Sequence, residues 1–175
     1  MHRFPLEGIR IADFTWMQSG PQATQYLAIM GAEVIKIESR QHLDIMRRYP
    51  SQGSVPEPTI DMSPIFAANN CSKKSCTLNL AQPRAVEIVK EIIKISDIVV
   101  ENFASGAMER WGLEYLSLKQ VKPDIIMLAA SGLGGVGPEK GYLAYAGTAH
   151  AVGGLTSVTG YPNGAPTTVG AFWGD

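Results

Sequence analysis

The amino-acid sequence predicts an α/β fold over residues 1–175, with an open, mainly parallel sheet and helices on both of its faces. Two observations carry this prediction. Short runs of β-branched and other apolar residues alternate with segments whose apolar residues have helical spacing. Successive strands are also separated by enough chain for a helical crossover, which parallel strands require. At least four strands in this order indicate a Rossmann-like architecture, in which ligands bind at the carboxyl ends of the strands.

The first βαβ unit is expected at residues 9–38. Residues 9–14 (IRIADF) have the pattern of a strand, and so do residues 33–38 (EVIKIE). Between them, Pro21 suits the first turn of a helix, where its missing N–H costs nothing, and Gly31 is a good residue to end it. We therefore expect the two strands to pair in parallel.

The rest of the chain continues the alternation after one interruption. Residues 39–68 carry four prolines and little periodicity, which predicts a long loop over a site. The elements expected after this loop are a strand at 75–80, a helix from Pro83 to Ile93, a buried strand at 97–100, short helices at 107–111 and 115–121, and a strand at 124–130. The strands at 9–14, 33–38, 97–101 and 124–130 should be parallel neighbours.

Composition and charge exclude several classes of function. The net charge is −1 and the pI is near 6.3, so the chain has no bulk attraction to nucleic acid or to an anionic membrane. No apolar run approaches the roughly 18 residues of a membrane span. The N-terminal segment lacks the apolar core of a signal peptide. We therefore expect a cytoplasmic protein with no nucleic-acid or membrane partner.

The cysteines and histidines do not predict a metal site. Cys71 and Cys76 are too few and too close for a disulfide framework, and we interpret them as buried structural thiols. His2, His42 and His150 show no metal-ligand spacing with each other or with the cysteines. No metal is expected.

A glycine-rich segment at residues 132–137 (GLGGVG) matches a dinucleotide-binding motif and follows a predicted strand. That motif needs a helix at its last glycines and an acidic residue about 20 positions further on. Pro138 follows instead, and residues 141–174 contain no acid. We therefore reject dinucleotide binding and expect a flexible loop beside an active site. A phosphate-binding P-loop motif is absent as well.

Charged residues give two candidates for a site. Asp175 follows 34 residues without Asp, Glu, Lys or Arg, and weakly polar surroundings leave an ionised carboxylate a less shielded nucleophile. The alternative is that Asp175 is merely where the chain stops. The basic side chains of residues 47, 48, 73 and 74 are either solvated charges or an anion site for a phosphorylated ligand.

Several motifs together resemble a known family over the whole chain. They are LEGIRIADFT at 6–15, QSGP at 18–21, GAEVIKIE at 31–38, NCSKKSCTLNL at 70–80, VENF at 100–103, RWGL at 110–113, SG at 131–132 and TGYPNGAP at 159–166. In this order they resemble the class III CoA-transferases, the CaiB/BaiF family. Members are about twice as long, so the chain resembles an N-terminal half, the first part of the large Rossmann-like domain without the small domain.

The resemblance implies a reaction between an acyl-CoA and a small carboxylic acid. The aspartate that matches Asp175 attacks the thioester, and a mixed anhydride and then an aspartyl-CoA thioester form. Gln18 matches a residue near the thioester. Positions that line the CoA groove match Glu38, Ser39, Arg40, Ser72, Lys73, Lys74, Ser75, Asn102, Phe103, Arg110 and Ser131. Arg110 is the foremost phosphate ligand, supported by Lys73 and Lys74.

Two departures from the family bear on particular contacts. Ser39 stands where some relatives carry a basic residue, and Ser131 where one branch has lysine. Full-length members form interlocked homodimers, so the resemblance also implies that residues 1–175 alone are inactive and marginally soluble.

Two rival functions stay open. The α-methylacyl-CoA racemases share the fold but use a histidine in a Gly-His-Asp segment, and the matching segment here is Gly141-Tyr142-Leu143, which disfavours proton abstraction. The other rival is a non-catalytic nucleotide- or partner-binding fragment. Formate, oxalate, succinate, carnitine-like and aromatic acids all remain candidate substrates.

Overall fold

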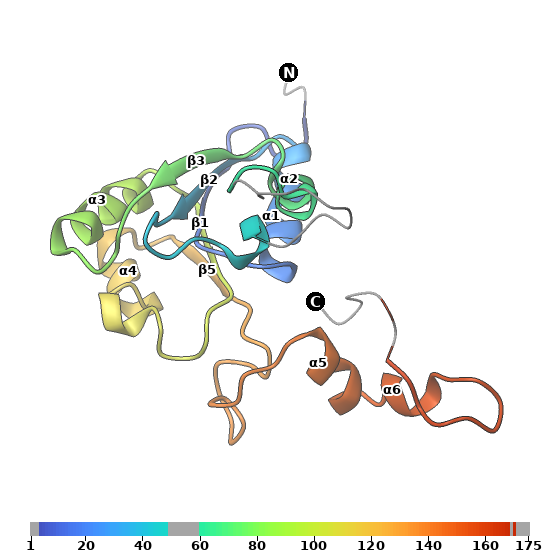
Figure 1. Cartoon of the computed structure of the whole chain (residues 1–175). Helices are drawn as coiled ribbons and strands as arrows, with labels where there is room; N and C mark the ends of the chain where they lie inside the picture. Colours follow the sequence, from blue (N-terminus) through green and yellow to red (C-terminus); the bar gives the residue numbers. More distant parts are fainter. Residues whose placement is uncertain (1–3, 49–59, 169, 171–175) are drawn as a thin grey trace.

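The computed structural model describes residues 4–48, 60–168 and 170, and these contain a five-stranded sheet (Figure 1). The strand order is β3-β2-β1-β4-β5. The strands are β1 (Arg10–Asp13), β2 (Glu33–Glu38), β3 (Lys74–Thr77), β4 (Ile98–Glu101) and β5 (Ile126–Ala129). Every neighbouring pair is parallel, which confirms the predicted strand neighbours.

Helices cover both faces of this sheet (Figure 1). Helices α1 (Ser19–Ile29) and α2 (Pro64–Asn70) lie on one side, and α3 (Pro83–Lys94) and α4 (Tyr115–Val121) on the other. Two short 3₁₀ turns are η1 (Ile45–Arg48) and η2 (Glu109–Trp111). The predicted α/β class, with helices on both faces of a parallel sheet, is confirmed.

Successive residues of β1 enter two different cores. Ile11 is fully buried in a cluster with Ala28 of α1, whereas Ala12 is buried in a cluster with Val89 and Ile93 of α3. Side chains of a strand alternate between its two faces, so a sheet covered on both faces needs apolar residues at nearly every position. This explains why β4 (IVVE) and β5 (IMLA) are almost entirely apolar, and why β1 carries apolar residues at successive positions.

Pro83 and Gly31 mark helix ends as expected. Pro83 is the first residue of α3, and Gly31 follows α1 with a φ of +103°. A Cβ at Gly31 would lie 2.4 Å from the Cβ of Phe4, so the position excludes a side chain both by conformation and by space.

The prediction of one long loop at residues 39–68 is partly wrong, because η1 and the start of α2 lie within this range. The hydroxyl of Ser63 accepts a hydrogen bond from the N–H of Phe66 at 3.3 Å, and Pro64 is the first residue of the helix. A serine N-cap followed by proline is a helix-start signal, but seven residues are too few to show periodicity.

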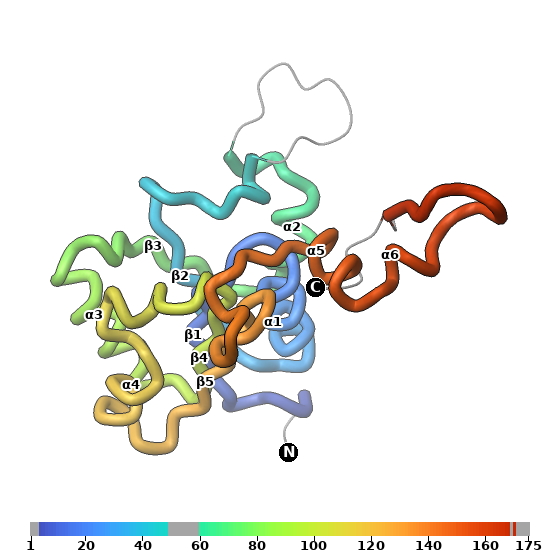
Figure 2. The backbone as a smooth tube through the Cα atoms, turned by 90° about the horizontal axis from the view of Figure 1, so that it is seen from below, coloured from blue at the N-terminus to red at the C-terminus, as the bar shows by residue number. Residues whose placement is uncertain are grey.

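Two further helices were not expected from the sequence. Helices α5 (Ala146–Val152) and α6 (Leu155–Val158) are short and are built mostly from small or β-branched residues. Figures 1 and 2 show that they form an arm extending away from the sheet and its helices. The arm and the segment just after it expose the side chains of Val152, Val158 and Tyr161.

In the part of the chain that the structure describes, no helix combines the length and the apolar character needed to cross a bilayer.

Candidate functional site

Two hydrogen bonds join the loop after β1 to the loop after β4. The backbone N–H of Trp16 donates to Oδ1 of Asn102 at 2.7 Å, and Nδ2 of Asn102 donates to the carbonyl of Trp16 at 2.7 Å. Strand order reverses between β1 and β4, and such a point is where open α/β sheets bind ligands. The predicted residue Asn102 therefore holds the main chain at the expected site.

The next residue of the same loop has an unusual backbone conformation. Met17 has a φ of 67°, a left-handed value that costs a non-glycine residue about 1–3 kcal/mol unless its surroundings impose it. The N–H of Met17 donates to Oδ1 of fully buried Asp44 at 3.1 Å, and Nζ of Lys36 donates to the carbonyl of Thr15 at 2.6 Å. These contacts fix the direction in which the following residue, Gln18, leaves the loop.

A buried ion pair lies beneath this loop. Nζ of Lys73 is 3.0 Å from Oδ2 of Asp13 and also donates to the carbonyl of Pro21 and to Oδ1 of Asn70. The other carboxylate oxygen of Asp13 accepts from the backbone N–H of Thr15 at 2.9 Å. Burial lowers the pKa of Lys73 to about 8, against the opposing attraction of the Asp13 carboxylate.

Gln18 lines a cavity of about 290 Å³ at the junction between the sheet and the arm. Its Oε1 accepts from Nδ2 of Asn69 at 2.8 Å, whereas its Nε2 has only a 3.4 Å contact with Gln22. Ser131 lines the same cavity, and its buried hydroxyl has no hydrogen-bond partner among the described residues. Tyr145, at the start of the arm, also lines this cavity.

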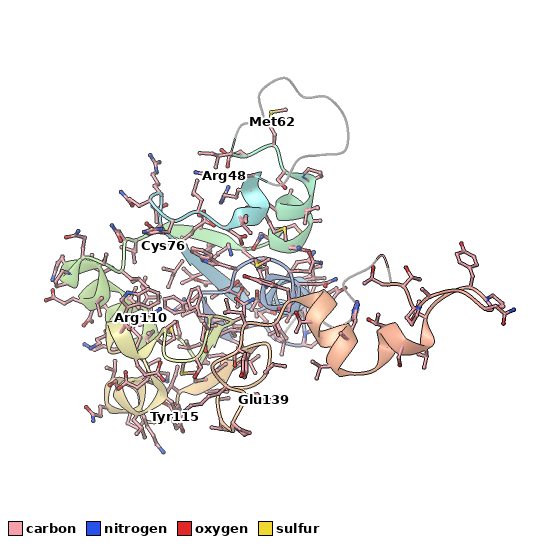
Figure 3. The ribbon with its side chains drawn as sticks, turned by 60° about the horizontal axis from the view of Figure 1, so that its bottom comes forward. Arg48, Met62, Cys76, Arg110, Tyr115 and Glu139 are labelled. Atoms are coloured by element: carbon pink, nitrogen blue, oxygen red, sulfur yellow. The ribbon has the colours of Figure 1, made fainter. Side chains whose placement is uncertain are left out.

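A second cavity, of about 320 Å³, is mostly apolar and aromatic. Phe103 makes edge contacts with Trp16 and with Trp111, each with ring centroids 5.7 Å apart. Arg110 also lines this cavity, is exposed, and has no ion pair within the described residues. Figure 3 shows Arg110 just before α4, on the side of the molecule that carries α3 and away from the arm.

A smaller hollow of about 180 Å³ lies between these two cavities and shares lining residues with each. It shares Trp16 and Phe103 with the aromatic cavity, and Asn102 and Ser131 with the cavity at Gln18. The three neighbouring hollows therefore form a row across the carboxyl ends of the strands. An elongated ligand could lie along this row, with one end at Arg110 and the other at Gln18.

A polar cavity of about 330 Å³ lies beyond the end of β2. Its lining includes Glu38, Ser39, Arg40 and Ser75. Arg47, which also lines it, donates from Nε to Oε1 of Glu38 at 2.7 Å, and its guanidinium lies 3.7 Å over the ring of Phe66. In this structure Arg47 is an internal residue and not a solvated charge.

The structure brings together most of the residues that the sequence indicated. Those lining the row of hollows or the polar cavity are Gln18, Glu38, Ser39, Arg40, Ser75, Asn102, Phe103, Arg110 and Ser131. Among the described residues, Ser72, Lys73 and Lys74 line none of these four spaces. Lys73 is held in the buried pair with Asp13, and Lys74 is exposed with its Nζ 3.1 Å from Glu33. Asp175 lies outside the described residues.

The sequence did not indicate the residues that shape the site through contacts with residues far away in the chain. Trp16, Asp44 and Lys36 build the loop before Gln18. An acid inside a mainly apolar strand, Asp13, is the sequence signal that could have indicated a buried network here. The interpretation of Cys71 as buried is wrong, because its thiol is exposed and free, while Cys76 is half-buried.

Neither a metal cluster nor a dinucleotide loop is seen within the described residues. No group of three or more His, Cys, Asp or Glu side chains is placed to hold a metal ion. Residues 132–145 form turns and loop, and the next helix begins only at Ala146, so the glycine-rich segment lacks the helix that its motif requires.

Comparisons with known proteins agree on one family. The model of CoA-transferase family III matches residues 6–175. The formyl-CoA:oxalate CoA-transferase of Streptomyces coelicolor is 43% identical over 171 residues, covering 97% of this chain and 40% of that protein. The protein of the same name from Bradyrhizobium sp. is 39% identical over 171 residues, covering 97% of this chain and 39% of that protein. The chain spans about two fifths of the length of these relatives.

Solved structures show the same fold. A CaiB/BaiF family protein from Brucella suis superposes with a TM-score of 0.88 at 29% identity, over 98% of this chain and 45% of that one. Rv3272 from Mycobacterium tuberculosis superposes with a TM-score of 0.84 at 30% identity, over 97% of this chain and 44% of that one.

Proposed function

This chain belongs to CoA-transferase family III, and from that premise we propose that it forms the N-terminal part of an acyl-CoA:carboxylate CoA-transferase. The observation that carries the proposal is the row of hollows across the strand ends, from Arg110 to Gln18. Its aromatic end suits the adenine of CoA, its cation suits a phosphate, and its far end suits a thioester.

We propose Asp175 as the nucleophile of a double displacement. Its carboxylate oxygen attacks the carbonyl carbon of the acyl-CoA and the C–S bond breaks. CoA leaves as the thiolate, and the acyl group stays on Asp175 as a mixed anhydride. The thiolate then attacks the aspartyl carbonyl, releasing the donor acid and forming an aspartyl-CoA thioester. The acceptor carboxylate repeats both steps in reverse. Covalent catalysis of this kind divides one difficult exchange into easier steps.

Gln18 is proposed to stabilise the oxygen on which charge develops during each attack. Asn69 holds Oε1 of its amide at 2.8 Å, which leaves Nε2 as the donor toward the cavity. A donor held in place before the reaction stabilises an oxyanion without reorganisation. The fixed backbone of Met17 supports this orientation.

Formyl-CoA and oxalate are the first substrate pair to test, because a relative named for that reaction is 43% identical to this chain. The assay is transfer of CoA between the two acids by the full-length protein. Exchange of an α-proton of a 2-methylacyl-CoA would instead support the racemase alternative. Binding of CoA without either reaction would support a non-catalytic binding module.

Replacing Arg110 tests the phosphate end of the proposed groove. In the full-length protein, Arg110→Ala should weaken the binding of CoA about tenfold or more and the binding of dephospho-CoA much less. The reason is that the guanidinium is proposed to contact the 3′-phosphate, which dephospho-CoA lacks. Isothermal titration calorimetry with both ligands measures this difference. Arg84→Ala is the matched control, since Arg84 is an exposed arginine of α3 whose partner is Glu87. Equal weakening of both ligands would place Arg110 on the pyrophosphate or give it a structural part.

The isolated 175-residue chain is a further test of the proposal that it is part of a longer, interlocked homodimer. Its described residues expose several large apolar side chains, among them Tyr142, Leu143, Val158 and Tyr161. Contiguous exposed apolar surface favours association. We expect residues 1–175 alone to show no CoA transfer and to elute as aggregates in size-exclusion chromatography with light scattering. A monodisperse, cooperatively melting monomer would contradict this expectation.

A further inference from the structure

Glu38, the last residue of β2, has one satisfied carboxylate oxygen and one orphaned oxygen. Oε1 accepts a hydrogen bond from Nε of Arg47 at 2.7 Å. Oε2 is buried, and no donor reaches it within the described residues. The whole residue is 7% exposed, so water has little access to it. A buried acceptor without a donor is costly and calls for a partner that the described residues do not supply.

The position of Glu38 shows what kind of partner would fit. Glu38 and Ser39 line both the aromatic cavity and the polar cavity beyond β2. The aromatic side contains Phe103 and Trp111, which suit a flat heteroaromatic base. The polar side contains Arg40, which is exposed and has no ion pair among the described residues. A ligand at Glu38 therefore has room for a base on the aromatic side, where Arg110 is also exposed, and for an anionic group near Arg40 on the polar side.

Arg47 fixes the carboxylate before any ligand arrives. Its guanidinium bonds both Glu38 and Asp61 and lies over the ring of Phe66. Arg47 thereby neutralises Glu38 and is itself held in place. An ionised carboxylate only accepts hydrogen bonds, so the group that completes Oε2 must be a donor, such as a hydroxyl or an amine, and not a phosphate oxygen.

We propose that Oε2 of Glu38 accepts a hydrogen bond from the 2′-hydroxyl of the CoA ribose. This inference rests on the proposed function, because it assumes that the ligand is CoA. The ribose is attached directly to the base, and Glu38 lines the aromatic cavity proposed for that base. Its 3′-oxygen carries a phosphate, so the 2′-hydroxyl is the free donor of that ring. Glu38 thus selects ribose over deoxyribose in the CoA substrate.

The test compares CoA with its 2′-deoxy analogue in the full-length protein by isothermal titration calorimetry. The wild-type protein should bind the 2′-deoxy analogue about tenfold more weakly, the usual loss for one hydrogen bond to a charged group. Glu38→Gln can keep an oxygen toward Arg47 while placing an N–H₂ donor where Oε2 was. This variant should bind CoA about tenfold more weakly and no longer distinguish the two ligands.

Asp61→Asn is the matched control, because it removes the other, largely exposed carboxylate from the same Arg47. It should keep the wild-type discrimination between CoA and its 2′-deoxy analogue. A CoA analogue lacking the exocyclic amine of adenine is a second comparison, and the wild-type and Glu38→Gln proteins should lose the same factor of affinity for it.

The following results would overturn the inference about Glu38. Equal affinity of the wild-type protein for CoA and the 2′-deoxy analogue would show that no group depends on the 2′-hydroxyl, while the proposed transferase function would stand. This comparison needs no variant, so it decides the question even if Glu38→Gln fails to fold. The inference would also be contradicted if Glu38→Gln weakened the binding of CoA and of its 2′-deoxy analogue by the same factor. It would likewise be contradicted if Glu38→Gln abolished only the difference in affinity between CoA and the amine-free analogue. No binding of CoA at all would instead overturn the proposed function.

Discussion

Asp175→Ala in the full-length protein should abolish acyl exchange and leave CoA binding nearly unchanged. The proposed reaction forms a covalent bond to this carboxylate, whereas binding energy comes from groups along the row of hollows. Removal of a nucleophile commonly lowers kcat by about 10⁴-fold or more. Asp175→Asn should behave in the same way, since an amide is close in shape but is a poor nucleophile. Steady-state transfer assays and calorimetric CoA titrations measure the two quantities.

Trapping gives a positive test of the same carboxylate. Incubation with acyl-CoA and then hydroxylamine should modify the peptide that contains Asp175, because anhydrides and thioesters react and a free carboxylate does not. Asp124→Asn is a suitable control, since Asp124 is an exposed acid that pairs only with Lys122 among the described residues and should be dispensable. Normal turnover of the Ala variant, or a label on Cys71 or Cys76, would contradict the aspartyl mechanism.

Asp13→Asn should lower the free energy of unfolding by about 3–5 kcal/mol, the usual cost of leaving one partner of a buried ion pair uncompensated. Asp13 is fully buried, and its partner Lys73 has a side chain that is 2% exposed. The substitution keeps the shape of the side chain but leaves the Lys73 ammonium without its anion. Urea unfolding of the full-length protein gives the change in midpoint and slope.

Two further variants separate charge burial from other effects. Glu33→Gln removes an acid that also bonds two cations, Arg10 and Lys74, but is 34% exposed, so it should cost less than about 1 kcal/mol. The double variant Asp13→Asn with Lys73→Met removes both charges and should recover more than half of the loss. If Asp13→Asn and Glu33→Gln shifted the unfolding midpoint equally, the buried pair would not have the importance assigned to it.

The sheet could be predicted from the sequence because its signals are local. The strand patterns at 9–14 and 33–38 place apolar residues on both faces of the sheet, and Pro83 and Gly31 mark helix ends through their own backbone preferences. Helix α2 was missed because its seven residues show no period, although Ser63 and Pro64 carry the start signal. Helices α5 and α6 lack apolar periodicity, so nothing in their pattern separated them from loop.

Site residues could be predicted only where a motif matched the family, or where a single charged residue followed a long uncharged stretch, as Asp175 does. Gln18, Asn102 and Arg110 were indicated by the resemblance, and the structure brings them to one row of hollows. Neighbouring letters could not show that Lys73 is buried, because its partner Asp13 is 60 positions away. The same holds for Asp44, which holds the backbone of Met17 across 27 positions. Ion pairs between distant residues decide which charges face a ligand.

The cavity at Gln18 has two walls of different origin. One consists of the loop after β1 and of Asn102, whereas the other consists of Ala144, Tyr145 and Ala149 at the base of the arm. The side chains of this second wall belong to neither hydrophobic core. Under the proposed function, substitutions there would change the size of the acyl group that fits without altering the sheet or the nucleotide end of the groove. Acid specificity would then be able to diverge on one scaffold while the proposed recognition of CoA stays the same.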